Sequence, residues 1–235
     1  MEYAFSYLPI CNKIYVFEPN DVKYIKDTFN ITNAFYCPVG YGQDYEVCNS
    51  ANTEKKYDIC FVGTPTKHRL ILLEKVAKHA MRCGYQMWAS GKFYDARHFW
   101  KKYIFRFKYP ALYHYIYNGD ISPKHVAQIY CQSKVCLNIH NVNHSGLNPR
   151  NFDIMATGSF LLVDKREDYG DLIHPGVDCD IYSDDNTLLD KLDYYLQHDD
   201  ERNTIAQNGL NNVINKLGIK HLLNNILNGR DDANG

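Results

Sequence analysis

Residues 144–164, HSGLNPRNFDIMATGSFLLVD, join a polar loop to a helix-forming stretch and then to an apolar strand. Asn148 is favoured as the N-cap of that helix, and Pro149 is favoured as its first residue. Gly158 ends the helical stretch, and FLLVD (160–164) follows as a buried strand. A loop, a helix and a strand in this order are typical of the repeating unit of a parallel sheet covered by helices.

The same alternation extends to both sides of this stretch. Short apolar runs predict further strands at 57–63, 85–91, 134–140 and 178–182. Helical spacing predicts helices at 68–84, 123–133, 149–157 and from 184 onward. Parallel strands need crossover connections, so we expect an α/β fold with a Rossmann-like parallel sheet and helices on both faces.

The N-terminal part predicts a separate, smaller unit. Residues 1–45 contain a strand at 13–19, a helix at 21–29 and a strand at 33–39. A polar segment without periodicity follows and predicts a linker at 46–56. The boundaries therefore predict a main domain at 57–228 and a disordered tail at 229–235.

The composition limits the classes of function. Of 235 residues, 45% are hydrophobic, and the net charge is −1, so the chain can bury a core and has no global attraction to nucleic acid. No apolar run approaches the ~20 residues that span a bilayer. Eight cysteines occur without a CxxC pair. We expect reduced thiols, a cytoplasmic protein and no structural metal site.

In a doubly wound sheet, ligands bind beyond the carboxyl ends of the strands. The loop before residue 149 lies at such an end, and its Gly146 allows a ligand to approach the backbone. A helix start presents unpaired N–H groups, and Arg150 adds donors that suit phosphate oxygens. Asp153, one turn further, is predicted to face ribose hydroxyls. The alternative is a surface ion pair between Arg150 and Asp153.

A second loop at a strand end has similar chemistry. FVGTPTKHRL places Gly63 directly after a strand, followed by Thr64, Lys67 and Arg69. These cations predict a diphosphate site shared with the loop at 146–150. The alternative is that Lys67 and Arg69 are solvated residues on the first turn of a helix.

Four motifs together resemble a known family. VGTxxxxR (62–69), ISPKHVAQIYCQSKVCLNIH (121–140), GLNPRNFDIMATGSFLLVD (146–164) and the run from DCDIYSDD to IAQNG (178–209) occur in this order. This order resembles the C-terminal half of the CgeB-like, or spore-maturation-type, glycosyltransferases, which are two-Rossmann GT-B enzymes. The similarity covers about 57–228, and 1–45 resembles the last strand–helix–strand of the preceding acceptor-side domain.

The resemblance implies a half-site for a nucleotide diphosphate sugar, with UDP or GDP as the nucleotide and without a metal. It implies transfer of the sugar to an acceptor that could be a glycan, a lipid or a protein. Arg150, Lys67 and His140 would be the catalytic residues. The donor would be bound by Gly63, Thr64, Arg69, Asp120, Ser122, Asn141, Asn143, Gly146, Leu147, Asn148 and Asp153. Among these, Asp153 matches the ribose-binding acid, and Asp120–Ser122 would lie near the base.

Two departures from the family pattern leave alternatives open. GT-B transferases often carry paired glutamates eight positions apart, and here those positions are Ser145 and Asp153. Only the final unit of an acceptor-side domain is recognisable, so either an upstream portion is missing from this chain, or the chain is a donor-binding module that works with a partner chain. The alternative to an enzyme is a non-catalytic nucleotide- or sugar-binding module that regulates or scaffolds a transferase.

The segment 93–117 does not fit the alternation of strands and helices. It holds eleven aromatic residues and five Lys/Arg, with no acidic residue after Asp95. One interpretation is a helix at about 96–108 that contacts a membrane surface or a partner. The other is an insertion whose aromatic residues pack over the sheet or against an absent domain.

Overall fold

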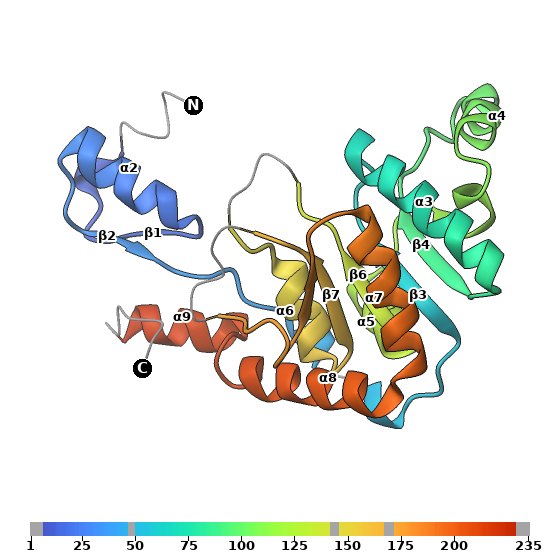
Figure 1. Cartoon of the computed structure of the whole chain (residues 1–235). Helices are drawn as coiled ribbons and strands as arrows, with labels where there is room; N and C mark the ends of the chain where they lie inside the picture. Colours follow the sequence, from blue (N-terminus) through green and yellow to red (C-terminus); the bar gives the residue numbers. More distant parts are fainter. Residues whose placement is uncertain (1–6, 47–49, 142–145, 167–171, 229–235) are drawn as a thin grey trace.

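The computed structural model describes residues 7–46, 50–141, 146–166 and 172–228. The main domain contains a six-stranded, entirely parallel sheet in the order β5-β4-β3-β6-β7-β8 (Figure 1). Its strands are β3 (Tyr57–Val62), β4 (Met87–Gly91), β5 (Ile116–Asn118), β6 (Ser133–Asn138), β7 (Phe160–Asp164) and β8 (Asp180–Tyr182). The predicted α/β fold class is confirmed.

The strand order reverses between β3 and β6. β4 and β5 extend the sheet on one side of β3, and β6, β7 and β8 extend it on the other. Cys60 pairs with Cys136, and Phe61 pairs with Leu137, so the two central strands end at the same level. Such a reversal leaves a crevice beyond the carboxyl ends of the two strands, where ligands of open α/β sheets bind.

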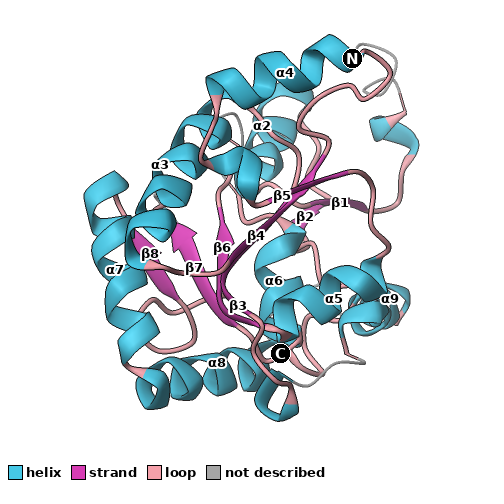
Figure 2. Cartoon of the chain, turned by 90° about the vertical axis from the view of Figure 1, so that its right-hand side faces the viewer, coloured by secondary structure: helices cyan, strands magenta, loops and turns pink. Residues whose placement is uncertain are grey.

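Helices cover both faces of this sheet (Figure 2). The helices α3 (Lys67–Cys83) and α7 (Asp185–Gln197) cover one face, and α5 (Pro123–Cys131) and α6 (Pro149–Ala156) cover the other. The helix α8 (Asp199–Val213) packs on α6 and β7, and α9 (Ile219–Leu227) follows it. Because successive strand residues point to opposite faces, Ile59 and Phe61 join one core and Cys60 joins the other.

The N-terminal unit has a core of its own. β1 (Ile14–Val16) and β2 (Ala34–Tyr36) pair in parallel, and α2 (Pro19–Phe29) connects them. Ile14, Ile25, Ile31 and Ala34 are its buried residues. The predicted strand–helix–strand order is correct, but the first strand ends at Val16 and the helix begins at Pro19. The buried Tyr41 then pairs with Gly218 at the start of α9.

The described part of the predicted linker packs against the main domain. The backbone N–H of Ser50 donates to the Thr157 carbonyl at 3.0 Å, and Lys55 Nζ donates to the Cys131 carbonyl at 2.8 Å. Cys131 is disulfide-bonded, so the expectation of reduced cysteines is wrong at this residue. Free thiols are present at Cys11, Cys37, Cys60, Cys83, Cys136 and Cys179. Short 3-10 turns complete the fold at Leu8–Ile10, Gln43–Tyr45, Ser50–Asn52 and Leu112–His114.

The aromatic segment forms the helix α4 (Phe99–Lys108) and then the strand β5. The strand was not predicted, because its three residues are too few to show a periodicity. In α4 only Phe105 is buried, so packing over the sheet does not account for the other aromatic residues of this helix. Among the described helices, none has the length and apolar character needed to cross a bilayer.

Candidate functional site

A cavity of about 580 Å³ lies beyond the carboxyl ends of β3 and β6, at the reversal of the strand order. Its polar lining comes from both loops that the sequence singles out, from the start of α6 and from the N-terminal unit. The lining residues that carry polar or charged side chains are Glu18, Tyr45, Thr64, Thr66, Arg69, Tyr130, His140, Asn141, Asn148, Arg150 and Asp153. Phe17, Val62, Val126, Gly146, Leu147 and Pro149 complete the wall.

Two guanidinium groups from different loops converge in this cavity. Arg69 and Arg150 each lie 6.0 Å from the centre of the Phe61 ring. Arg69 is held by its Nε on the Ile139 carbonyl at 2.8 Å and by its Nη1 on the Thr64 carbonyl at 2.9 Å. Burial and the neighbouring Arg150 lower the pKa of Arg69 to about 10. Arg69 therefore remains cationic at neutral pH, and the two guanidinium groups together favour a ligand with more than one negative charge.

The glycine after β3 is required by Arg150. A Cβ added at Gly63 would lie 2.7 Å from Nη2 and 3.1 Å from Cζ of Arg150. The guanidinium therefore packs directly on the backbone of the β3 loop. The sequence predicted that this glycine serves a ligand, and the structure shows that it makes room for the arginine that faces the cavity.

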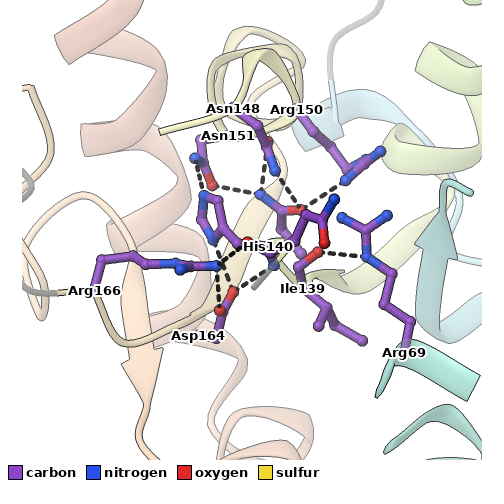
Figure 3. A network of polar contacts seen from close by, with 10 residues as sticks. Arg69, Ile139, His140, Asn148, Arg150, Asn151, Asp164 and Arg166 are labelled. Carbon is purple, nitrogen blue, oxygen red and sulfur yellow. Dashed lines mark hydrogen bonds and ion pairs between the residues drawn. The ribbon is translucent and has the colours of Figure 1, made fainter. Parts of the chain in front are cut away.

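A chain of hydrogen bonds runs from the Arg150 guanidinium through buried polar side chains to His140 (Figure 3). Asn138 Oδ1 accepts from Arg150 Nη1 at 2.9 Å, and Asn138 Nδ2 donates to Asn151 Oδ1 at 2.6 Å. The Asn151 amide nitrogen therefore faces His140 and donates to its Nε2 at 3.0 Å. Asn138, Asn151 and His140 are buried, so these polar groups depend on one another for their hydrogen bonds.

The chain ends at Asp164, the last residue of β7. Asp164 Oδ1 accepts from the backbone N–H of His140 at 2.7 Å and from its ring Nδ1 at 2.8 Å. Burial would raise the pKa of Asp164, but these bonds and the nearby Arg166 bring the pKa below its usual value. His140 therefore carries its proton on Nδ1 and accepts at Nε2. Both ring nitrogens of His140 make hydrogen bonds to other residues of the protein.

The start of α6 is partly occupied by the protein itself. Gly146 donates its backbone N–H to Glu18 Oε2 of the N-terminal unit at 2.7 Å. Asn148 is the N-cap by position but makes no side-chain cap bond, and its Oδ1 accepts from Asn138 instead. The predicted anion site thus contains a carboxylate oxygen in this structure.

Asp153 faces the cavity one turn after Arg150. Its Oδ1 accepts from the Gly42 N–H at 3.2 Å, which joins α6 to the segment that follows β2. Burial raises the pKa of Asp153 to about 7, although the Gly42 N–H and the Arg150 guanidinium both favour the carboxylate. The neighbouring Tyr45 stacks on Tyr130 with the ring centres 6.2 Å apart, and this pair forms an aromatic wall beside Asp153.

The predicted site residues divide into three groups. The cavity brings together Thr64, Arg69, His140, Asn141, Gly146, Leu147, Asn148, Arg150 and Asp153, and Gly63 packs on Arg150. Lys67, Asp120 and Ser122 do not line it. Lys67 is exposed at the start of α3, Asp120 pairs with Lys92 at 2.8 Å, and Ser122 caps α5. Asn143 lies outside the described residues.

Eight polar residues of the site were not predicted from the sequence: Glu18, Tyr45, Thr66, Tyr130, Asn138, Asn151, Asp164 and Arg166. Asn138 and Asn151 did carry a signal, because each is a polar residue inside an apolar strand or helix. A side chain of that kind has to be hydrogen-bonded when it is buried. Glu18 carried no such signal, since its partner Gly146 is 128 positions away.

A group of side chains able to bind a metal lies elsewhere in the described part of the chain. Ligand atoms of His79, Cys83 and Asp193 come within 4.8 Å of one another on α3 and α7. Asp193 Oδ1 accepts from His79 Nε2 at 2.7 Å and from the Tyr85 hydroxyl at 2.9 Å. The hydrogen bonds of this group join α3 to α7 and do not involve the cavity.

Comparison with known proteins identifies the family. The family described as glycosyl transferase-like matches residues 69–228, which is more than half of the chain. The chain belongs to the glycosyl transferase-like family. The matched range begins at Arg69 and includes Arg150 and Asp153, so most of the cavity lies within it. No curated protein matches the sequence.

Solved glycosyltransferase structures share the fold of this glycosyl transferase-like chain. Sucrose-phosphate synthase from Thermosynechococcus elongatus is 14% identical with a TM-score of 0.70, over 97% of this chain and 60% of that one. Anabaena HepE in complex with UDP-glucose is 11% identical with a TM-score of 0.66, over 97% and 68%. A TarM mutant from S. aureus in complex with fondaparinux, alpha-GlcNAc-glycerol and UDP is 14% identical with a TM-score of 0.70, over 97% and 45%.

At these identities the comparison establishes the GT-B fold. The chain spans 60% of the sucrose-phosphate synthase and 45% of the TarM structure. Because 97% of the chain is aligned in each case, the aligned part includes elements of the N-terminal unit as well as the six-stranded sheet.

Proposed function

We propose that the cavity between β3 and β6 binds the nucleotide diphosphate sugar of a glycosyl transfer reaction. The observation that carries this proposal is the convergence of the Arg69 and Arg150 guanidinium groups over Phe61 at the reversal of the strand order. A diphosphate carries the charge and the oxygen acceptors that two such groups require. Membership in the glycosyl transferase-like family supports a nucleotide sugar as the source of that diphosphate.

The proposed chemistry follows from the charge of the leaving group. The acceptor oxygen forms a bond to the anomeric carbon, and the bond from that carbon to the diphosphate breaks with its electron pair going to the diphosphate oxygen. The acceptor proton passes to water. Negative charge then increases on the diphosphate. Arg150, held by Asn138, is placed to neutralise it, and the network from Asp164 through His140 to Asn138 keeps the guanidinium in place. No resident metal is needed for this stabilisation.

The remaining parts of the donor are assigned by chemistry. We place the ribose hydroxyls at Asp153, whose carboxylate accepts hydrogen bonds, and the base toward α5, with UDP or GDP as the nucleotide. The aromatic side of the cavity at Tyr45 and Tyr130 supports a planar group there. The R-x-F-D sequence at 150–153 supports the narrower CgeB-like subtype.

We further propose that residues 1–45 belong to an acceptor-side domain. A two-stranded sheet with one helix is marginal as an independent structure, which supports its membership in a larger domain. The partial coverage of the related structures agrees with this assignment. The acceptor, whether a glycan, a lipid or a protein, would then be bound mainly by residues beyond the main domain.

A thermal-shift experiment with UDP, GDP and ADP, each with and without Mg²⁺, tests donor binding. A ligand at about 100 times its Kd adds about 2.7 kcal/mol to the free energy of unfolding, or about 5–10 °C in Tm for a protein of this size. Arg150→Ala should abolish the shift. Arg97→Ala is the matched control, because Arg97 is exposed and lies outside the cavity. If none of the nucleotides raises the Tm, the donor site is wrong.

Turnover separates an enzyme from a binding module. Slow hydrolysis of the stabilising UDP- or GDP-sugar, lost in Arg150→Ala, would support a transferase. Stable binding without hydrolysis or transfer would instead indicate a nucleotide-binding module that regulates a transferase. The requirement for Mg²⁺ in the same assay tests the metal-independent reaction directly.

A further inference from the structure

The helix α4 presents an exposed hydrophobic face. Five of its ten residues are large, hydrophobic and exposed: Phe99 (77%), Trp100 (48%), Tyr103 (63%), Ile104 (56%) and Phe107 (90%). Its contact with the protein is made by the buried Phe105, whose ring meets those of Phe93, Tyr94 and Tyr109. The helix lies at the margin of the main domain (Figure 1). A cluster of exposed apolar side chains of this size is typical of an interaction surface.

Hydrophobic and cationic residues are segregated around the axis of α4. At 3.6 residues per turn, the five exposed residues cover an arc of about 140°, and Phe105 points to the opposite side. Lys102 and Arg106 border this arc on one side, and Lys101 and Lys108 border it on the other. The hydrophobic face therefore points away from the protein and has cations along both edges.

The charge of this surface differs from that of the whole chain. Residues 96–119 contain five Lys/Arg and no acidic residue, whereas the net charge of the protein is −1. Asp95 binds Arg97 at 2.9 Å and lies 3.4 Å from Lys101, so these two cations are partly neutralised. Within the described part of the chain, no carboxylate pairs with Lys102, Arg106 or Lys108. Arg106 lies 5.6 Å from the centre of the Tyr113 ring, and Lys108 lies 5.5 Å from the centre of the Tyr109 ring.

We propose that α4 is an interfacial helix that binds the protein to an anionic lipid surface. Aromatic residues on the outer arc would enter the boundary between headgroups and acyl chains, while the bordering Lys and Arg would extend to lipid phosphates. A second copy of the chain fits poorly, because two such faces would bring their cationic edges together. The helix follows the carboxyl end of β4, so the bound membrane would lie on the same edge of the sheet as the cavity.

Co-sedimentation with lipid vesicles tests this proposal without any assay of activity. Vesicles of phosphatidylcholine alone are compared with vesicles that contain phosphatidylglycerol. The protein should pellet with the anionic vesicles and much less with the neutral ones, and added salt should weaken the binding. Neutralising Lys102, Arg106 and Lys108 to Gln should lower the partition coefficient about a hundredfold.

Two further variants distinguish lipid binding by the α4 face from non-specific hydrophobic adsorption to vesicles. Phe99→Ser/Tyr103→Ser/Phe107→Ser should abolish pelleting while the Tm stays unchanged, since these side chains contribute little to the core. Ile71→Ser/Met81→Ser/Leu227→Ser is the matched control, because these residues are 48%, 50% and 81% exposed on other helices, and it should pellet like the wild type. In Trp88→Phe protein, the remaining Trp100 emission should shift to the blue with anionic vesicles.

The proposal is overturned if the wild type does not pellet with anionic vesicles, or if the α4 serine variant pellets as well as the wild type. It is also overturned if the protein forms dimers in the absence of lipid that the α4 serine variant loses, because the face would then be an interface between two copies. These outcomes do not depend on nucleotide binding, so a protein that fails to bind vesicles would leave the proposal of a donor site unaffected.

Discussion

Glu18 Oε2 accepts a hydrogen bond of 2.7 Å from the backbone N–H of Gly146, which joins the N-terminal unit to the loop before α6. Glu18 is 9% exposed and lines the same cavity as Arg69 and Arg150. A carboxylate oxygen at a backbone N–H occupies a position that suits an oxygen of a diphosphate. The contact therefore competes with an anionic ligand in the structure described.

Glu18→Gln should raise the affinity for a nucleoside diphosphate. The substitution keeps the size of the side chain and removes a negative charge from the cavity wall. Two unit charges about 4 Å apart repel by about 1 kcal/mol in water, so we expect an affinity gain of at least about fivefold. Isothermal titration calorimetry measures the change directly.

The matched control is Glu54→Gln, which removes one charge from an exposed residue outside the cavity. Its affinity should equal that of the wild type at physiological salt, because screening weakens exposed charges at a distance. Equal or weaker binding by Glu18→Gln would contradict the competition between Glu18 and the diphosphate.

The contrast between Arg150 and Glu18 shows what the sequence could and could not predict. Arg150 follows an N-cap residue and Pro149 in one short stretch, so its place at a helix start is a local property. Glu18 is 128 positions from Gly146, and the two meet only because the N-terminal unit packs beside the cavity. The same holds for Asp164, which reaches His140 through the pairing of β7 with β6.

For the fold as well, features set by local sequence could be predicted, and features set by contacts between distant residues could not. In the structure, the predicted strands of the main domain lie within a few residues of their predicted bounds, because each is a compact apolar run between turn residues. β5 was missed, since its three residues pair only with β4 and are surrounded by aromatic residues with other partners. Strand order is a tertiary property, and the site at the reversal depends on it.

Gly63→Ala should reduce nucleotide affinity while leaving the fold nearly intact. The new Cβ would meet the end of the Arg150 side chain at 2.7 Å, and that flexible end can move. This movement breaks the hydrogen bond from Nη1 to Asn138 and displaces the guanidinium. We expect about a tenfold loss of affinity, which corresponds to the lower end of the free-energy range for a hydrogen bond to a charged group. Calorimetry gives the affinity, and a thermal melt should show a change below about 1 kcal/mol.

Gly91→Ala is the informative comparison for this prediction. Its Cβ would lie 2.2 Å from the carbonyl oxygen of Gly63, which is backbone and cannot swing aside. It should destabilise the protein by about 1–3 kcal/mol. If Gly63→Ala destabilises as strongly as Gly91→Ala, then Arg150 is fixed more rigidly than we infer.

Nucleotide binding should depend on the ionisation of Asp153, whose pKa burial raises to about 7. Ribose hydroxyls donate to a carboxylate more strongly than to a neutral carboxyl, so affinity should rise between about pH 6 and pH 8. Asp153→Asn should remove this rise. The phosphate of the ligand titrates identically with both proteins, so the ratio of the two affinities isolates Asp153. A ratio that does not vary with pH would contradict the role of Asp153.

Asp153 should also affect stability with a definite sign. Between its unfolded pKa of about 3.9 and the folded value of about 7, the folded protein binds more protons than the unfolded chain. The free energy of unfolding from this group therefore decreases as the pH rises through that range. Urea melts of Asp153→Asn should show that the variant gains stability relative to the wild type as the pH rises from about 4 to 7.

Asp164 should have the opposite effect on stability. Although burial acts to raise its pKa, the bonds from His140 and the nearby Arg166 bring the folded pKa below the unfolded value of about 3.9. The folded protein then binds fewer protons than the unfolded chain, so this stabilisation is present above about pH 4 and lost as the pH falls further. In urea melts measured at several pH values, Asp164→Asn should reduce the fall in the free energy of unfolding at acidic pH (the acid limb). The exposed Asp200→Asn should follow the wild type. The variant should also weaken nucleotide binding, because His140, Asn151 and Asn138 hold Arg150 in sequence. An unchanged acid limb in Asp164→Asn would mean that His140 does not depend on this carboxylate.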